Sequence, residues 1–492
     1  MATEAPKKGL GTFDLTAIIV GSMVGSGIFF LPGGMLASLG SHDAAGNVVL
    51  GGGAWAIMLA WVLGAVIALC GGLVFAELGA AFPKAGGQYA FLRDSVGRAW
   101  GFLFSWTAFA VVQTGTIAAV AVALATAFDT LLAAMGSGGL PGSPVNLGFV
   151  VVPKYGTAAL AIAIVWLLTG INYLGVRRAA DVNNVATIAK LAAIGFIVLS
   201  AFVLGRSAGN FGGVGASFTG FGLGAFAVAT SSSLFAYDGF AQATFVAAEV
   251  KDARRVLPKA ILIATCLVAG VYLLATYAYF HVLPVGEVSQ AALTGDVPIA
   301  TESTTQVLGG IAGGLVASMI VVSTFGTVNA YVLASPRIYW SVARDREFPR
   351  PFGLLSRHGT PSYGLVYGAI WAGFLTLTGS YLALADLVVF GLYVFYLVTM
   401  VGYFLLRRSD PSAFDGFKSP LRPLPAILFG LASVGVLWSY LDKDLGALAA
   451  TGDVPRFFGS TTMMAAILIG IGALVYWVRH LLLHRNPTPG LK

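Results

Sequence analysis

Charged residues and cysteines are scarce in this chain, and each shortage excludes a class of protein. Only 10% of the 492 residues are charged, whereas soluble domains usually carry about a quarter. Hydrophobic residues make up 57% of the chain, which indicates a protein embedded in a membrane. The two cysteines, Cys70 and Cys266, fall in apolar segments, so we expect no disulfide framework and no disulfide-linked partner subunit.

Motifs for catalysis and cofactor binding are also missing. The five histidines show no metal-ligand spacing, and we find no phosphate-binding loop and no nucleophile triad. We therefore expect no enzyme, no metal, no cofactor and no ATP-driven pump. The polar residues 1–10 precede a long apolar run without a small-residue cleavage site, so we expect no cleaved signal peptide.

Long apolar runs predict an all-α polytopic membrane protein with twelve transmembrane helices. A helical span needs about 20 mostly apolar residues. With no soluble domain between the runs, residues 1–492 are expected to form one transmembrane transporter domain. The runs lie at about 13–37, 54–79, 99–128, 157–175, 184–205, 222–247, 258–282, 308–335, 362–380, 383–406, 423–441 and 459–479.

The placement of basic residues predicts the orientation. If the N-terminus is cytoplasmic, most of the 28 Lys and Arg residues fall in the tails or in inside connections, while outside connections hold only Lys154, Arg206, Lys443 and Arg456. This asymmetry is the positive-inside pattern and predicts that both termini are cytoplasmic. The net charge of +7 is then a signal of topology, and we expect no nucleic-acid partner. A cell membrane, such as a bacterial inner membrane, is the expected location.

The first apolar run contains the stretch Gly25-Ser26-Gly27. A glycine in a helix interior costs roughly 0.5–1 kcal/mol relative to alanine, so a helix that merely spans would not need it. We interpret the stretch as a break, because backbone groups freed at membrane depth are tolerated where they line a cavity. The alternative is a close helix-packing face formed by Gly21 and Gly25.

A second break is expected in the sixth run, at residues 231–240, where Asp238 precedes Gly239. A carboxylate at a helix centre costs at least about 2.5–3.5 kcal/mol on insertion scales. The two breaks lie five runs apart, which predicts an inverted repeat of residues 12–206 and 222–406, followed by two further helices at 423–479. The free N–H groups of one half-helix favour a carboxylate, and the free carbonyls of the other favour an ammonium. Two adjacent breaks would therefore bind an amino acid zwitterion.

Three motifs resemble those of the amino acid–polyamine–organocation (APC) superfamily of permeases. They are GSGIF at residues 25–29, FAELGAAFPKAGGQY at 75–89 and FAYDGF at 235–240. The chain is most similar to the branch of L-type and bacterial broad-specificity amino acid transporters, although Ala241 stands where that branch has an asparagine. The resemblance implies a five-plus-five inverted-repeat (LeuT-like) fold and amino acid transport by alternating access.

The resemblance also implies site residues at the two breaks. The substrate carboxylate would meet the backbone N–H groups of Ser26, Gly27 and Ile28. The ammonium would meet carbonyls at Met23, Phe235 and Asp238, with Ala236 in the same break and Phe235 as an aromatic lid. Thr116 and Tyr331 fall near the side-chain pocket of the family.

Lys190 is the one basic residue expected inside a span. It would either extend toward the membrane surface or, as the resemblance implies, reach the first helix at the place where sodium-coupled relatives bind Na⁺. We favour the second interpretation. It predicts sodium-independent transport, by proton symport or by exchange, while the hydroxyls of Ser323 and Thr324 keep a sodium site open as an alternative.

Three acidic residues in or near the apolar runs are given expected roles. For Asp238 we favour hydrogen bonds from the freed N–H groups of its break over contact with a cationic substrate side chain. Glu77 and Glu249 are expected to anchor inner loops, Glu77 through Lys84 or Arg93.

These observations predict a secondary active transporter of amino acids in a lipid bilayer. A cationic amino acid or polyamine exchanger is the alternative within this class, and an amino acid sensor without transport is the alternative from another class.

Overall fold

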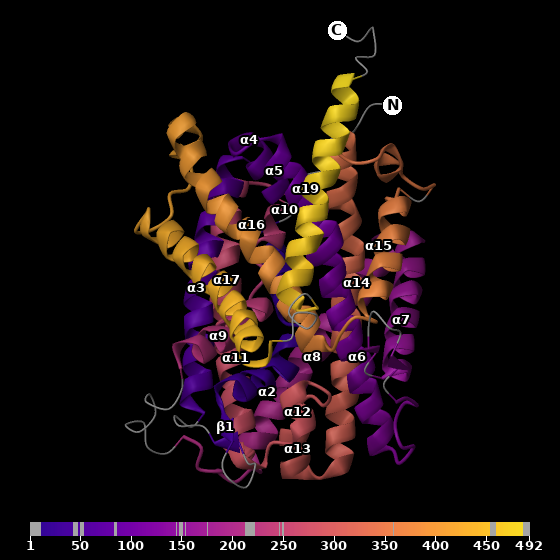
Figure 1. Cartoon of the computed structure of the whole chain (residues 1–492). Helices are drawn as coiled ribbons and strands as arrows, with labels where there is room; N and C mark the ends of the chain where they lie inside the picture. Colours follow the sequence, from indigo (N-terminus) through magenta and orange to yellow (C-terminus); the bar gives the residue numbers. More distant parts are fainter. Residues whose placement is uncertain are drawn as a thin grey trace.

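The computed structural model describes residues 11–42, 48–49, 54–82, 86–143, 145–146, 151–152, 154–174, 176–211, 222–245, 247, 250–357, 359–452 and 459–485. This part of the chain is a bundle of helices with two short antiparallel strand pairs (Figure 1). In the first pair β1 (Ser41–His42) aligns Ser41 with Val49 of β2 (Val48–Val49), and in the second β3 (Val145–Asn146) pairs with β4 (Val151–Val152). The fold is helical, as the apolar runs predict.

A helix occupies each of the twelve predicted runs. In chain order they are α1 (Thr12–Met23) with α2 (Gly27–Leu39), α3 (Trp55–Ala81), α5 (Arg98–Thr107) with α6 (Gln113–Ala134), α7 (Tyr155–Tyr173), α8 (Val176–Val203), α9 (Leu223–Ala236) with α10 (Gln242–Phe245), α11 (Ala253–Val282), α14 (Gly310–Arg344), α15 (Ser362–Leu375), α16 (Tyr381–Ser409), α17 (Leu424–Thr451) and α19 (Thr461–Arg485). A π-helical turn, Ala108–Val112, joins α5 to α6.

The helices differ in how clearly they could cross a membrane. Eight described helices are long and apolar enough, and the bent pair α1–α2, with an angle of 44°, would make a ninth span. Shorter apolar helices are residues 188–203 of α8, α9 and α15. The chain is therefore a helical multi-pass membrane protein, while the count of twelve spans and the inverted repeat stay predictions.

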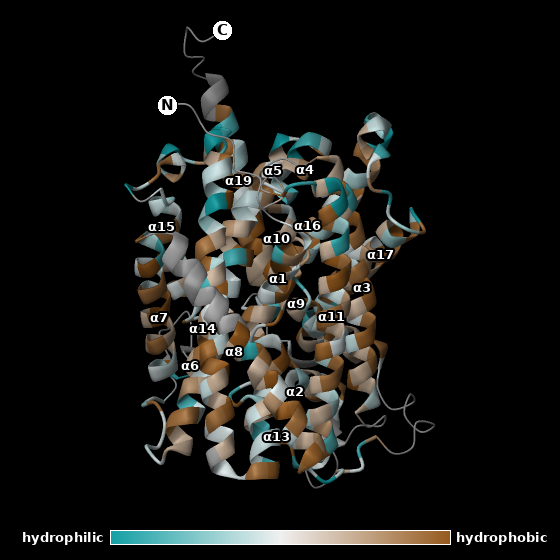
Figure 2. Ribbon diagram, turned by 180° about the vertical axis from the view of Figure 1, so that it is seen from behind, coloured by the Kyte–Doolittle hydropathy of each residue, from teal (hydrophilic) through white to brown (hydrophobic). Residues whose placement is uncertain are grey.

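The connecting helices separate the two ends of the bundle. The helix α4 (Gln88–Ser95) lies at one end, together with the C-terminal part of α19, and α12 (Gln290–Thr294), α13 (Ile299–Leu308) and β1 lie at the other (Figure 1). We call these the α4 end and the α13 end. Hydrophobic residues dominate the middle of the helices, and hydrophilic residues gather at the α4 end (Figure 2). Connections that the basic residues assign to the inside and outside thus lie at opposite ends.

Candidate functional site

The two breaks pack directly against each other in the interior of the bundle. A Cβ added at Gly27 would lie 2.8 Å from the Cβ of Ala236. One added at Gly239 would lie 2.4 Å from Cγ of Met23. Both distances are below van der Waals contact, so glycine is needed at each position for this close approach. The structure therefore brings together the breaks that the sequence places five apolar runs apart.

The first turn of α2 offers backbone donors at the break. The first N–H groups of a helix have no carbonyl partner within it. In α2 these belong to Ser26, Gly27 and Ile28, because the N–H groups of Phe29 and Phe30 both bond to the Ser26 carbonyl, at 3.0 and 3.3 Å. Ser26 is 1% exposed and Ile28 fully buried. The dipole of α2 adds positive potential at this point, which suits an anion.

The carbonyls at the end of α1 are bound by a lysine from α8. Lys190 is 1% exposed, and its Nζ donates to the carbonyl oxygens of Gly21 and Val24, at 2.7 Å each. Its ammonium therefore lies against the first helix and is directed away from the membrane surface.

Tyr272 of α11 links the two breaks, and sequence reasoning did not identify it. Its hydroxyl lies 2.5 Å from the carbonyl oxygen of Met23 and 3.2 Å from that of Ala236. The ring packs against Trp61, with centroids 5.0 Å apart, and against Tyr237, at 5.3 Å. A tyrosine in an apolar run carries no spacing signal, so only the folded chain shows this contact.

Asp238 is bound by a residue of a different helix. The residue is 9% exposed, and its Oδ1 accepts a hydrogen bond from the hydroxyl of Tyr396 in α16. The local interpretation expected backbone N–H donors from the break itself. The structure instead shows a side-chain donor, while the Asp238 N–H bonds to the Phe235 carbonyl at 3.3 Å. That carbonyl keeps a second lone pair for another donor.

An aromatic group covers the start of α2. The Tyr381 ring, at the beginning of α16, lies 5.1 Å from that of Phe30 and 6.2 Å from that of Phe235, centroid to centroid. The Ser26 hydroxyl donates to the Tyr381 hydroxyl at 3.2 Å. Phe235, the expected lid, is therefore accompanied by Tyr381, which the sequence did not single out.

The two expected pocket residues lie on different helices. Thr116 of α6 is 5% exposed and donates to the Val112 carbonyl at 2.7 Å, within its own helical segment. Tyr331 of α14 is 8% exposed. The helix α14 approaches the first break through Thr327, whose Cγ2 would lie 3.2 Å from a Cβ at Gly25.

The hydroxyl pair proposed for sodium is buried on α14. Thr324 donates to the carbonyls of Ile320 and Val321, at 2.7 and 3.1 Å, whereas the Ser323 hydroxyl has no hydrogen-bond partner among the residues that the structure describes. Within the described residues, no group of three or more His, Cys, Asp or Glu side chains is placed to hold a metal ion.

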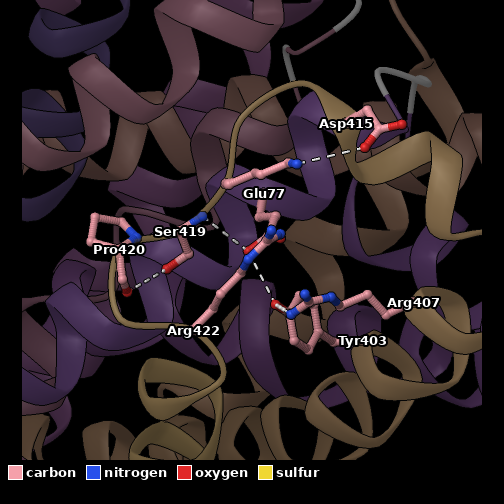
Figure 3. A network of polar contacts seen from close by, with 8 residues as sticks. Glu77, Tyr403, Arg407, Asp415, Ser419, Pro420 and Arg422 are labelled. Atoms are coloured by element: carbon pink, nitrogen blue, oxygen red, sulfur yellow. Dashed lines mark hydrogen bonds and ion pairs between the residues drawn. The ribbon is translucent and has the colours of Figure 1, made fainter.

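Glu77, near the end of α3, lies in a network of polar contacts (Figure 3). Its carboxylate is fully buried and accepts from the Tyr403 hydroxyl at 3.0 Å, from the Ser419 N–H at 3.3 Å and from Arg422 Nη1 at 3.3 Å. The partner is thus Arg422, in the connection between α16 and α17. The expectation of Arg93 is wrong, and Lys84 and Glu249 lie outside the described residues.

Arg93 instead joins α4 to the end of α14. It pairs with Asp94 at 2.8 Å and with Asp345, which also accepts from the Tyr89 hydroxyl at 2.9 Å. The hydrogen bond to Asp94 raises the pKa of the Arg93 guanidinium. Burial, and then the Asp345 carboxylate, raise the pKa of the Tyr89 hydroxyl. Both groups therefore keep their protons from about pH 5 to 9.

A further carboxylate inside an apolar run, Asp386, was not identified from the sequence. Asp386 of α16 accepts from the Tyr440 hydroxyl at 2.9 Å, and Lys443 Nζ lies 3.6 Å from its other oxygen. Both partners belong to α17. An acidic residue within an apolar run is itself the signal that could have found this contact.

Comparison with known proteins supports the family to which the motifs point. A family model described as "Amino acid permease" matches residues 10–477. The chain is 29% identical over 464 residues to the "Serine/threonine exchanger SteT" of Bacillus subtilis (strain 168), covering 92% of this chain and 97% of that protein. It is 30% identical over 443 residues to the "Large neutral amino acids transporter small subunit 2" of Rattus norvegicus, covering 88% and 77%. It is 28% identical over 439 residues to the "b(0,+)-type amino acid transporter 1" of Mus musculus, covering 88% and 82%.

Proposed function

The chain belongs to the amino acid permease family, and from this premise we propose that it is a secondary active transporter that moves amino acids across a cell membrane by alternating access. The proposal includes twelve spans, the five-plus-five inverted repeat and cytoplasmic termini, so that the α4 end faces the cytoplasm. The relatives named above are an exchanger and amino acid transporters by name, which supports the substrate class. No catalytic reaction is part of this function.

The observation that carries the proposal is the contact between the two breaks. The donors of Ser26, Gly27 and Ile28 would receive the substrate carboxylate. The carbonyls of Met23, Phe235 and Asp238, beside Ala236, would receive the ammonium. Charges of the two signs are then placed as the half-helix dipoles require. The Tyr272 hydroxyl already occupies the Met23 carbonyl, so substrate would share that oxygen or displace the hydroxyl.

Lys190 supports transport without sodium. Its Nζ already donates to the carbonyl oxygens of Gly21 and Val24, which are oxygen ligands of the kind that a sodium ion needs. The side-chain pocket would include Thr116 and Tyr331. Exchange is supported by the name of the bacterial relative, and proton symport is the other sodium-independent mode in the proposal.

Counterflow in proteoliposomes tests the proposal. Vesicles loaded with a mixture of unlabelled amino acids should take up labelled amino acid in wild type, equally in sodium and in choline at fixed pH. Ser26→Lys, which places a long side chain at a buried position, should abolish uptake of every substrate alike. Uptake that stops in choline would overturn the sodium-independent mode. Ligand binding without counterflow would identify the protein as a sensor.

A second candidate, a carrier of cationic amino acids, is favoured by one observation. The buried Asp238 carboxylate belongs to the break that would receive the ammonium, and the structure gives it the neutral Tyr396 hydroxyl as a partner. A negative charge there would favour a second positive charge on the substrate.

A further inference from the structure

A small cavity lies between α7, α14 and α15, apart from the two breaks. It measures about 40 Å³ and is lined by Asn172, Arg337, Gly359, Thr360 and neighbouring apolar side chains. Since a bound water needs at least about 10–15 Å³ by this measure, the cavity has room for two or three water-sized polar groups. Thr360 donates to the carbonyl of Tyr173, the last residue of α7, at 3.4 Å, which closes one side.

Asn172 leaves a hydrogen-bond acceptor unused in the wall of this cavity. The residue is 1% exposed, and its Nδ2 donates to the Leu168 carbonyl and to Oδ1 of Asn329, at 2.8 Å each. If the Asn172 amide were turned over, its oxygen would face the Leu168 carbonyl oxygen and Oδ1 of Asn329. These two contacts therefore fix the orientation of the amide. Its Oδ1 then has no partner within the described part of the chain. An unpaired buried acceptor costs about 1–3 kcal/mol, which indicates that a ligand supplies the missing donor.

Arg337 supplies a positive charge at the same cavity. It lies on α14 and is exposed, and no carboxylate of the described residues pairs with it. A guanidinium that no described carboxylate pairs with is well suited to a phosphate, to which it can donate two parallel hydrogen bonds. The cavity thus offers the Arg337 guanidinium to an anion and Oδ1 of Asn172 to a neutral hydrogen-bond donor.

The surface beside the cavity is apolar and aromatic. On α15 the side chains of Tyr363, Tyr367 and Ile370 are 40%, 48% and 51% exposed, and Leu174, after α7, is 49% exposed. The two helices form an outer edge of the bundle (Figures 1 and 2). Tyrosines are enriched where helices meet the membrane–water interface. A ligand of this cavity would therefore lie with its remaining part along a lipid-facing surface.

We propose that the cavity binds the headgroup of a phosphatidylglycerol-type lipid. The phosphate meets the Arg337 guanidinium, a glycerol hydroxyl donates to Oδ1 of Asn172, and the acyl chains lie against α7 and α15. The recognised chemistry is a glycerophosphate group. This site is distinct from the amino acid site, and it stands whether or not that proposed function is correct.

Thermal unfolding in nanodiscs tests the arginine. Replacing phosphatidylcholine by phosphatidylglycerol should raise the apparent Tm of the wild type by at least about 2 °C, since a ligand that binds only the folded state stabilises it. Arg337→Gln should lose this rise. The matched control is Arg344→Gln, on the same helix, where the guanidinium lies 4.8 Å from the Trp340 ring centroid; it should keep the rise. No rise in the wild type, or an equal rise in Arg337→Gln, would overturn the site.

Two further ligands test the role of Asn172 and the need for acyl chains separately. Phosphatidylethanol carries the same charge without a headgroup hydroxyl, so it should give a smaller rise than phosphatidylglycerol; an equal rise would overturn the role of Asn172. Glycerol 3-phosphate added to phosphatidylcholine nanodiscs presents the same group without acyl chains. Protection equal to that by phosphatidylglycerol would overturn the lipid as the source. Native mass spectrometry should show about tenfold less bound phosphatidylglycerol on Arg337→Gln than on Arg344→Gln, as expected for one lost charge-assisted contact.

Discussion

The two breaks at the centre of the bundle obtain their charges in different ways. In the first, residues 24–26 separate α1 from α2 and none of them is charged; its positive charge comes from Lys190 of α8. In the second, residues 237–241 separate α9 from α10, and the negative charge, Asp238, belongs to the break itself and is bound by Tyr396 of α16.

This difference suggests a division of tasks. The charge at the first break belongs to Lys190 on α8. A mutation of Lys190 therefore removes the charge without changing the sequence of the break itself. In the second break the carboxylate and the turn are part of one segment. The first break would thus bind groups that all amino acids share. The second break is where a charge on the substrate side chain could be distinguished.

Removing the Lys190 ammonium from the first break should reduce transport more than any other substitution considered. Lys190→Met leaves the Gly21 and Val24 carbonyls without their donor, and two charge-assisted hydrogen bonds contribute about 1.5–3 kcal/mol each. We expect counterflow to fall about a hundredfold or more. The control Lys154→Met removes a partly exposed ion pair with Asp129, which is worth at most about 1 kcal/mol, and should transport nearly as well as wild type. Comparable rates in both variants would show that the ammonium is not needed.

Filling the contact between the breaks should have the next largest effect. The Gly27→Ala methyl group would lie 2.8 Å from the Cβ of Ala236, and overpacking of this kind costs about 1–3 kcal/mol. We expect uptake of every substrate to fall about tenfold. Gly195→Ala adds the same methyl group on α8, where nothing lies within 4 Å, and should have no effect. If Gly27→Ala changed only the preference among substrates, the first break would not be the shared part of the site.

Removing the link between the breaks should have a smaller effect. Tyr272→Phe deletes the hydroxyl that contacts the Met23 and Ala236 carbonyls; one net hydrogen bond is worth about 1 kcal/mol, so kcat/KM should change about fivefold. Tyr279→Phe is the matched control, because this buried hydroxyl on the same helix has no hydrogen-bond partner. Equal behaviour of the two variants would argue against a role for the Tyr272 hydroxyl.

Sequence reasoning identified the breaks but few of the residues that bind them. Glycines and an aspartate inside apolar runs are costly, so Gly27 and Asp238 are visible without a structure. Tyr272 is not, because a tyrosine is ordinary in an apolar run and its partners lie far away in the sequence. The same limit explains Glu77, for which a nearby Lys84 or Arg93 was expected and the distant Arg422 was found.

The smallest change in overall rate is expected for Asp238→Asn, and it decides what the second break recognises. The amide oxygen can still accept from Tyr396, so the packing of the break should be kept and neutral amino acids should be transported within about threefold of wild type. If Asp238 selects charge, competition by lysine and arginine should be lost in this variant, because the carboxylate that attracts the substrate cation is gone. Tyr396→Phe supplies the complementary measurement: it keeps the carboxylate and removes its donor, so competition by cationic amino acids should persist. If Asp238→Asn lost transport of neutral and cationic amino acids together, Asp238 would have a structural role in the second break and no role in selecting charge.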